Sequence, residues 1–231
     1  MLPDWAGIRG AIPGSRSATA PERLLPRGRH DLPREFVAHT QRDRLIDAMA
    51  STVGARGYAG ASLGEVCAAA GVSTKAFYQH FADKEACFLA TFKRGVTLMQ
   101  TTVLAAYARP ARWPVRMRVA LDTLLHVLAA EPAFARLAVV EVLAAGPRAR
   151  DCRRDLLATY YAFFADAPRR AGQPEVPDRA VAAIVAGVYG VIFEYVSTGR
   201  TAELPTCLPD LTYFMLAPFI GPRAAAANAA G

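Results

Sequence analysis

Side chains that can donate hydrogen bonds gather in one short stretch of the sequence, between residues 73 and 81. Phe77 and Phe81 are four residues apart, so in a helix they share one face. The opposite face then presents the polar side chains Thr74, Lys75, Tyr78 and Gln79. Hydroxyl, ammonium and amide groups on one exposed face can bind base edges and phosphate oxygens. The stretch therefore has the chemistry of a surface that reads nucleic acid.

Two short helices and a tight turn are predicted to hold this surface in place. Ser62 and Glu65 form the S-x-x-E pattern of a capping box, which predicts a helix start at Ser62. Gly71 can adopt the left-handed conformation that a tight interhelical turn requires, and Ser73 is a suitable cap for the next helix. Such a pair of helices is a helix-turn-helix, whose second helix lies in the DNA major groove.

Neighbouring helices complete this unit. Apolar residues recur at helical spacing from Leu45 to Val53, which predicts a first helix that begins near Phe36 and ends at Gly57. Asp83 is expected to cap a fourth helix that runs to about Tyr107. Three donors around the second half of the motif are placed to hold backbone phosphates: Tyr78, His80 and Lys84.

The rest of the chain is predicted to be helical as well. Alanine and leucine are abundant, and apolar stripes separated by Pro and Gly predict further helices over residues 113–130, 133–145, 148–165, 178–198 and 208–219. The expected fold is all-α with about nine helices. The expected divisions are a disordered, basic and Pro-rich tail (1–35), a helix-turn-helix domain (36–85), a larger helical regulatory and dimerisation domain (86–221) and a disordered tail (222–231).

Composition and motifs exclude several classes of protein. Apolar residues make up 53% of the chain and charged residues 20%, which is the composition of a folded protein. The net charge of +7 suits a polyanionic partner, although residues 40–85 carry equal numbers of acidic and basic side chains. The four cysteines show no metal-binding spacing, and no nucleophile is paired with a base, so we expect no metal, no cofactor and no enzymatic activity.

The apolar segments of the sequence bear on where in the cell the protein is found. The longest nearly apolar run, 180–193, is shorter than the roughly 20 residues of a bilayer span, which predicts a buried core helix and no membrane partner. No apolar signal segment is visible near the start, so we expect a cytoplasmic protein.

One stretch resembles a known family. The A-G-V-S turn of residues 70–73, the F-Y-x-H-F segment of 77–81 and the D-K-E of 83–85 together are similar to the signature of the TetR family of bacterial transcriptional regulators. The close resemblance covers roughly residues 40–95. It implies that Thr74, Lys75 and Ala76 face bases. The full set of expected DNA-binding residues is Ser62, Ser73, Thr74, Lys75, Ala76, Tyr78, Gln79, His80 and Lys84.

The resemblance also implies roles for the larger helical part. The last two helices, 178–198 and 208–219, would pair with their copies in a homodimer, so that a pseudo-palindromic operator is bound. A ligand pocket is expected among Trp113, Met117, Leu121, Leu125, Phe134, Leu137, Glu141, Tyr160, Tyr161, Phe164, Tyr189 and Phe193. For Glu141, pairing with a nearby Arg is an alternative to ligand binding.

The predicted function is thus a homodimeric repressor that a small apolar ligand releases from double-stranded operator DNA. Two alternatives stay open. The first is an activator, or a regulator controlled by a partner protein. The second is a helical small-molecule-binding protein or enzyme that does not bind DNA.

Overall fold

The computed structural model describes residues 10–21, 32–169 and 175–230. Within these residues it contains ten α-helices, short 3₁₀ and π segments and no β-strand, which confirms the expected all-α fold. Contacts group the chain into two compact units. We call Ile8–Leu98 together with Glu131–Arg150 the N-terminal unit, and Met99–Ala130 together with Asp151–Gly231 the C-terminal unit.

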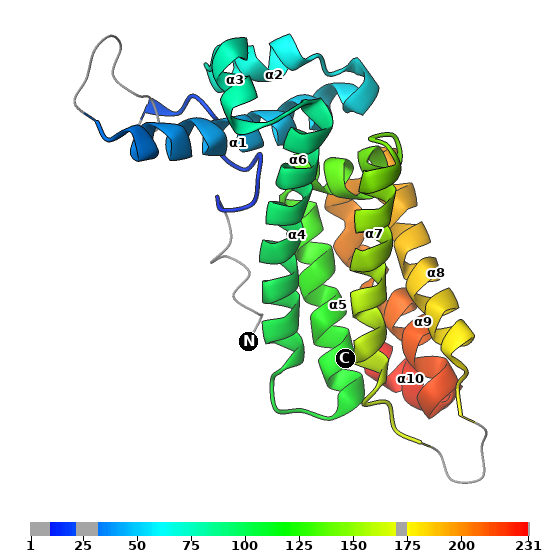
Figure 1. The fold of residues 1–231 in the computed structure, drawn as a ribbon. Coiled ribbons are helices and arrows are strands. Elements are labelled where there is room, and N and C mark those ends of the chain that lie inside the picture. The colour runs from blue at the N-terminus through cyan, green and yellow to red at the C-terminus, as the bar shows by residue number, and fades with distance from the viewer. Residues whose placement is uncertain (1–9, 22–31, 170–174, 231) are drawn as a thin grey trace. The chain divides into compact units, whose positions relative to one another are not determined.

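The N-terminal unit contains α1 (Arg34–Gly60), α2 (Leu63–Ala70), α3 (Thr74–His80) and the first part of α4 (Lys84–Tyr107). α2 and α3 both contact α1, and they contact each other (Figure 1). Their common core is apolar and fully buried, because the helical stripes predicted from sequence converge on it. Its largest members are Leu45, Met49, Val53, Phe77, Phe88 and Phe92.

A second segment belongs to the same unit. Residues 131–150 follow α5 in the chain and contain α6 (Pro132–Ala135), the π-helix η3 (Arg136–Val140) and the 3₁₀ turn η4 (Glu141–Leu143). The sequence predicted one continuous helix over 133–145 and a domain boundary after residue 85. The contacts instead join 131–150 to α1, which Gly54 permits because a Cβ there would lie 2.9 Å from Ala133. Periodicity along one helix cannot reveal such a close approach to another.

The predicted N-terminal tail is wrong in part. Residues 10–21 form turns, Ile12 is completely buried, and the Gly14 N–H donates to Asp47 Oδ1 at 3.0 Å. α1 begins at Arg34, two residues before the expected start. The buried residues of these turns, Ile12, Pro13 and Ala18, follow no apolar period, so the pattern did not indicate order here. Residues 1–9 and 22–31 of the predicted tail lie outside the described residues.

The C-terminal unit is a helical bundle. It comprises the second part of α4 with α5 (Trp113–Ala130), α7 (Pro147–Thr159) from Asp151 onwards, the 3₁₀ turn η5 (Tyr160–Phe164), α8 (Asp178–Ser197), η6 (Thr201–Cys207), α9 (Leu208–Ile220) and α10 (Pro222–Ala230). α5 and α8 both pack against α9 and η6 (Figure 1). The predicted helix 148–165 is divided into α7 and η5.

The predicted disordered tail after residue 221 is also wrong. Residues 222–230 form α10, which packs on α9 and α5 and buries Ala225 and Ala229. Alanine has the highest helix propensity, so this alanine-rich segment is helical once α9 covers one side of it. Its low complexity had suggested a frayed end.

α8 differs from the expected core helix. It buries Ile184, Val185, Val188, Ile192 and Val196, which lie on one face only. Within the described residues, α8 is the continuous helix whose length and apolar composition would also suit a membrane span. This is weak evidence, because core helices of soluble proteins meet the same criteria.

Candidate nucleic-acid interface

α2 begins with the capping box that the sequence predicted. The Ser62 hydroxyl oxygen accepts the Glu65 N–H at 3.2 Å, and Glu65 Oε2 accepts the Ser62 N–H at 2.9 Å. These bonds with Ser62 lower the pKa of Glu65 below its usual value. Arg56 Nη1 lies 2.8 Å from the other carboxylate oxygen of Glu65. The start of α2 is therefore fixed to the end of α1 as well as to itself.

The turn between α2 and α3 has the expected left-handed glycine. Gly71 has φ 59° and ψ 37°, and its N–H donates to Ala68 O at 3.0 Å. Val72 is buried beneath the turn. From α1, Arg44 Nη2 donates to Gly71 O at 3.3 Å. A Cβ at residue 71 would clash with Arg44 Nη2, so a side chain there would displace this end of the arginine.

α3 separates its apolar and polar faces as predicted. The Ser73 hydroxyl oxygen accepts the Ala76 N–H at 3.1 Å and caps the helix. Phe77 is 0% exposed and Phe81 5%, and their ring centroids lie 5.6 Å apart. Tyr78 is 57% exposed, which is unusual for a tyrosine. The exposed residues of α3 are Thr74, Lys75, Tyr78 and Gln79, while Ala76 is half-buried.

The structure gives other partners to three residues that were expected to hold phosphates. Ser62 is exposed, but its hydroxyl also donates to Glu65 Oε2 at 2.8 Å. Lys84 Nζ donates to Tyr58 O at 2.8 Å and Ala61 O at 3.0 Å, so two of its three N–H groups already have acceptors within the chain. Lys84 also lies 4.1 Å from the centroid of the Tyr58 ring.

His80 is the third of these residues. Its Nε2 lies 3.1 Å from Gln41 Oε1 on α1. Partial burial, with the nearby Arg42 charge, lowers the pKa of His80 below 6.5. The imidazole is therefore neutral near pH 7, and it fixes α3 to α1 instead of supplying a positive charge.

Sequence reasoning missed the arginines of α1. Arg42 is exposed, its Nη1 donates to His80 O at 3.0 Å, and its guanidinium lies 4.4 Å from the centroid of the Phe81 ring. It occupies the C-terminal end of α3, where a cation also complements the helix dipole. Only its place on the polar face of α1 was predictable, because a contact between residues 38 positions apart has no local signal in the sequence.

The residues predicted to bind ligand are divided between the two units. Phe134, Leu137 and Glu141 belong to the N-terminal unit, where the first two are fully buried. The Glu141 carboxylate accepts from Arg136 Nε at 3.2 Å and from the Tyr58 N–H at 2.8 Å. The alternative of pairing with an arginine is therefore confirmed for Glu141.

The other nine residues belong to the C-terminal unit, where an aromatic cluster forms. The Trp113 ring lies 5.3 Å from Phe219, and Phe164 lies 5.5 Å from Phe219. Buried with Trp113 on α5 are Met117, Leu121 and Leu125. Tyr189 and Phe193 on α8 have ring centroids 6.4 Å apart, and the Arg153 guanidinium lies 4.0 Å from the Tyr189 ring.

A cavity adjoins this aromatic cluster. It has a volume of about 630 Å³ and lies among the end of η5, the start of α8 and the end of α9. Two of the predicted ligand-binding residues, Tyr161 and Phe164, line it. Apolar walls come from Val181, Ala182 and Phe219, with Arg169, Glu175 and Arg179 among the charged lining residues. Tyr160 directly precedes Tyr161 in the chain, and its buried hydroxyl has no hydrogen-bond partner among the described residues.

α8 and α9 present an unburied apolar face. In the middle of α8 the exposed positions are small, at Ala183, Ala186 and Gly190, and Glu194 is the next exposed position along the helix. On α9, Tyr213 is 42% exposed and Phe214 is 44% exposed. Gly187 lets the Phe214 ring lie against α8, because a Cβ there would be 2.9 Å from it. Two exposed aromatic side chains beside small residues are typical of a face that another helix covers.

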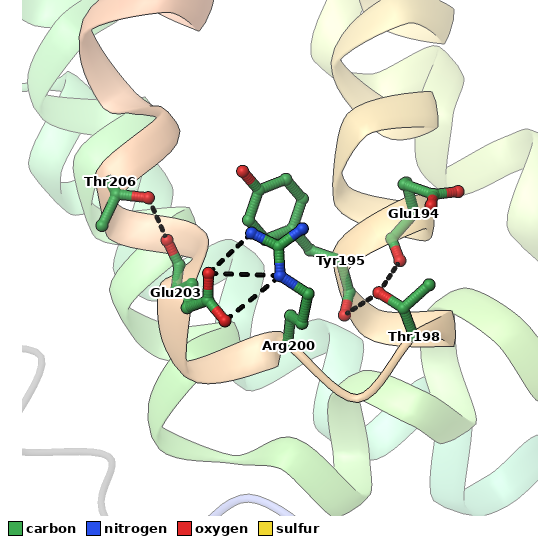
Figure 2. Close-up of polar contacts among 6 residues, drawn as sticks. All are labelled: Glu194, Tyr195, Thr198, Arg200, Glu203 and Thr206. Carbon is green, nitrogen blue, oxygen red and sulfur yellow. Dashed lines mark hydrogen bonds and ion pairs between the residues drawn. The ribbon is translucent and has the colours of Figure 1, made fainter.

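The turn that joins α8 to η6 is held by polar contacts, which Figure 2 shows. Thr198 Oγ1 donates to Glu194 O at 2.6 Å and ends α8. Arg200 Nη2 donates to Glu203 Oε2 at 2.7 Å, and the guanidinium also lies 4.4 Å from the Tyr195 ring centroid. This pairing with Arg200 lowers the pKa of Glu203. The turn thus fixes the path of the chain from α8 towards α9.

Metal ligation finds no support among the described residues, which contain no group of three or more His, Cys, Asp or Glu side chains suited to an ion. All four cysteines are free thiols, and Cys67, Cys87 and Cys207 are buried.

Comparison with known proteins identifies the motif. Residues 45–91, which span α2, α3 and the facing parts of α1 and α4, match the family model described as bacterial regulatory proteins, tetR family. A sequence search of curated proteins gave no significant match.

Solved structures share most of the fold. FadR from Bacillus subtilis, solved with stearoyl-CoA, has 14% sequence identity and a TM-score of 0.65, over 78% of this chain and 98% of that one. FadR from Bacillus halodurans has 17% identity and a TM-score of 0.67, over 78% and 97%. The multidrug binding protein EbrR, complexed with imidazole, has 24% identity and a TM-score of 0.53, over 81% and 97%. At these identities the similarity shows the fold.

Proposed function

We propose that the chain is a DNA-binding transcriptional regulator of the TetR type, and that it acts as a cytoplasmic, homodimeric repressor which a small apolar ligand releases from its operator. In this proposal α3 lies in the major groove and two copies bind a pseudo-palindromic duplex.

The exposed polar face of α3 is the observation that carries the proposal. Lys75, in the first turn of α3, can reach a guanine edge or a phosphate, and the Thr74 methyl can contact a thymine methyl. Gln79 can pair with adenine, and the exposed Tyr78 hydroxyl can donate to a phosphate. Lys84 has one N–H left for a phosphate once its two carbonyl partners are counted.

The dimer is supported by the apolar face of α8 and α9. A single recognition helix reads few base pairs, so a two-fold pair of subunits doubles the contacts and lengthens the operator. The small residues of α8 would let a copy approach closely, and Tyr213 and Phe214 would be buried by it.

The ligand is proposed to bind in the C-terminal unit. The cavity beside Phe164 and Phe219 has apolar walls, and its volume lies within the range of about 300–1,000 Å³ that is typical of small-molecule sites. Similar folds bind stearoyl-CoA in B. subtilis FadR and imidazole in EbrR, which supports a small molecule as effector. Ligand binding would favour a conformation with lower affinity for the operator.

DNA binding is tested with matched lysine variants. The operator would be selected from a pool of random duplexes by the wild-type protein, and affinities measured by fluorescence anisotropy over a range of salt concentrations. Lys75→Ala should weaken binding at least tenfold, and if Lys75 contacts a phosphate the slope of log K against log salt should fall by about 0.9. Lys93→Ala, on the exposed side of α4, is the control and should bind normally. Failure of the wild-type protein to enrich any duplex would refute the proposal.

The dimer and the effector need separate measurements. Phe214→Arg should convert the dimer to monomer in analytical ultracentrifugation, whereas Leu104→Arg, at another exposed apolar residue (52% exposed), should not. Fatty acyl thioesters and lipophilic cations would be titrated into the complex with the selected duplex. A reporter gene behind that duplex distinguishes repression from activation, and expression that rises with the regulator would contradict the repressor assignment.

A further inference from the structure

We infer that Glu141 is a positioning residue for DNA binding: its carboxylate sets the direction in which the chain enters α2, by holding the break in α1 at Gly57. The inference rests on the proposed function, because it explains how the reading helices are aimed. It concerns contacts within the N-terminal unit.

α1 is interrupted just before the helix-turn-helix. Gly57 has φ 74° and ψ 163°, a backbone conformation that is almost restricted to glycine. The break removes the Tyr58 N–H from the regular helical ladder. Four residues later the chain reaches Ser62, the N-cap of α2. The turn from Gly57 to Ala61 therefore decides where α2 begins and how it points.

Two charged groups hold this turn from within the fold. Glu141 Oε2 accepts the Tyr58 N–H at 2.8 Å, and Lys84 Nζ donates to Tyr58 O and Ala61 O at 2.8 and 3.0 Å. An ionised partner makes such bonds shorter and stronger than neutral ones. The turn is therefore fixed through both its donor and its acceptor groups.

The Glu141 carboxylate packs closely against the backbone of Gly57. A Cβ at residue 57 would lie 3.2 and 3.3 Å from the two carboxylate oxygens, so only glycine admits the carboxylate this close. Glu141 is 8% exposed, and a buried carboxylate needs partners. Besides the Tyr58 N–H it has Arg136, whose Nε lies 3.2 Å from Oε1.

The π-helix explains how Arg136 and Glu141 come to face the same way. They are five residues apart, and in an α-helix of 3.6 residues per turn such positions point about 140° apart. η3 spans Arg136–Val140, and the Glu141 N–H donates both to Leu137 O and to Arg136 O, the second of which is the i→i+5 bond of a π turn. The wider turn aligns the two side chains. Conversion of η3 to a regular α-helix would rotate Glu141 away from the pair and from Tyr58.

The segment that bears Glu141 is also suited to a regulatory input. Residues 131–150 leave the C-terminal unit after α5 and return to it at α7, so both ends are continuous with helices of that unit. A change of register in η3 would release the Tyr58 N–H and with it the start of α2. π turns within helices are frequent at functional sites.

The test compares three variants of the full chain with wild type. Glu141→Ala removes both bonds of the carboxylate. Glu141→Gln keeps an acceptor for the Tyr58 N–H but loses the charge. Asp151→Ala is the matched control, because it breaks an exposed carboxylate–arginine pair (Asp151 Oδ1 to Arg154 Nη2, 2.8 Å). Each is assayed for binding to the duplex selected by wild type and to a random duplex, and for hydrogen exchange at the Tyr58 amide.

We expect Glu141→Ala to lose at least tenfold in affinity for the selected duplex and to exchange the Tyr58 amide at least tenfold faster. Affinity for random duplex and circular dichroism should be unchanged at a temperature well below unfolding. Glu141→Gln should fall between Glu141→Ala and wild type, and Asp151→Ala should match wild type. A residue that only stabilised the fold would lower the melting temperature without changing the ratio of selected to random binding.

Two results would overturn the inference. If Glu141→Ala stays folded and binds the selected duplex like wild type, the carboxylate does not aim α2. If Glu141→Ala does not fold, Glu141→Gln decides, and wild-type affinity with wild-type exchange at Tyr58 would refute a role for the charge. If wild type selects no duplex, the proposed function fails first, and amide exchange at Tyr58 then shows separately whether the bond exists.

Discussion

Two glycines on either side of the start of α2 should respond in opposite ways to the same substitution. Gly57→Ala places a side chain on a backbone with φ 74° and ψ 163°, which costs about 1–3 kcal/mol. The added methyl reduces the entropy of the unfolded chain, which returns roughly 0.4–1 kcal/mol. The Cβ would also press on the Glu141 carboxylate at 3.2 and 3.3 Å. We expect the free energy of unfolding to fall by about 2 kcal/mol in total.

Gly64→Ala is the matched control. Gly64 lies inside α2, is exposed, and a Cβ there would meet nothing within 4 Å. Alanine in place of an unconstrained helical glycine should raise the free energy of unfolding by roughly 0.5–1 kcal/mol. The two variants contain the same added methyl group, so composition cannot explain a difference between them.

Urea unfolding followed by far-ultraviolet circular dichroism would measure both. With a dependence on urea of about 2 kcal/mol per molar, Gly57→Ala should lower the transition midpoint by about 1 M. Gly64→Ala should raise it by a few tenths of a molar unit. Wild-type stability of Gly57→Ala would show that the break in α1 is not constrained as described. A destabilised Gly64→Ala would refute the helical assignment of that position.

Three further predictions concern the same unit. Phe77→Ala should lower the free energy of unfolding by about 3–5 kcal/mol, because it empties a fully buried site between α1, α2 and α3. A decrease of less than about 1 kcal/mol in urea unfolding would contradict this packing. Burial and Arg42 lower the pKa of folded His80, so near the ordinary value of 6.5 the unfolded chain binds more protons than the folded one, and stability should rise as the pH increases through 6.5. His80→Gln should flatten this rise in urea titrations, and an unchanged slope would refute it. Burial raises the pKa of the Cys87 thiol to about 12, so a thiol reagent should label the half-exposed Cys152 before Cys87. Mass spectrometry of the labelled native protein measures this order. Modification of Cys87 in native protein would show that the core is open to the reagent.

Local chemistry made the reading motif predictable. The Ser62–Glu65 box, the left-handed Gly71 and the Ser73 cap each depend on residues within a few positions of one another, and the structure confirms all three. The division of α3 into a buried face with Phe77 and an exposed face with Tyr78 follows from helical spacing alone. The same reasoning gave an all-helical chain, because apolar period and propensity agree along most of it.

Partners distant in the sequence were not predictable. His80 and Lys84 have the side chains of phosphate ligands, yet their donors are directed to Gln41, Tyr58 and Ala61. The order of residues 10–21 depends on Ile12, which is buried without any periodic pattern around it. In each case the outcome depends on which surfaces meet, and the spacing of neighbouring residues contains no information about that.

The sequence by itself determined the helices of the helix-turn-helix, their caps and the face of α3 that is exposed, since these follow from interactions within one or two turns. Only the tertiary structure decided that residues 131–150 return to α1 and that Glu141 holds the Tyr58 N–H across 83 positions of the chain. A carboxylate within an apolar run of the sequence indicates that a buried charge needs a partner. The fold alone selects which donor that partner is, because burial removes water and leaves the nearest aligned N–H as the replacement.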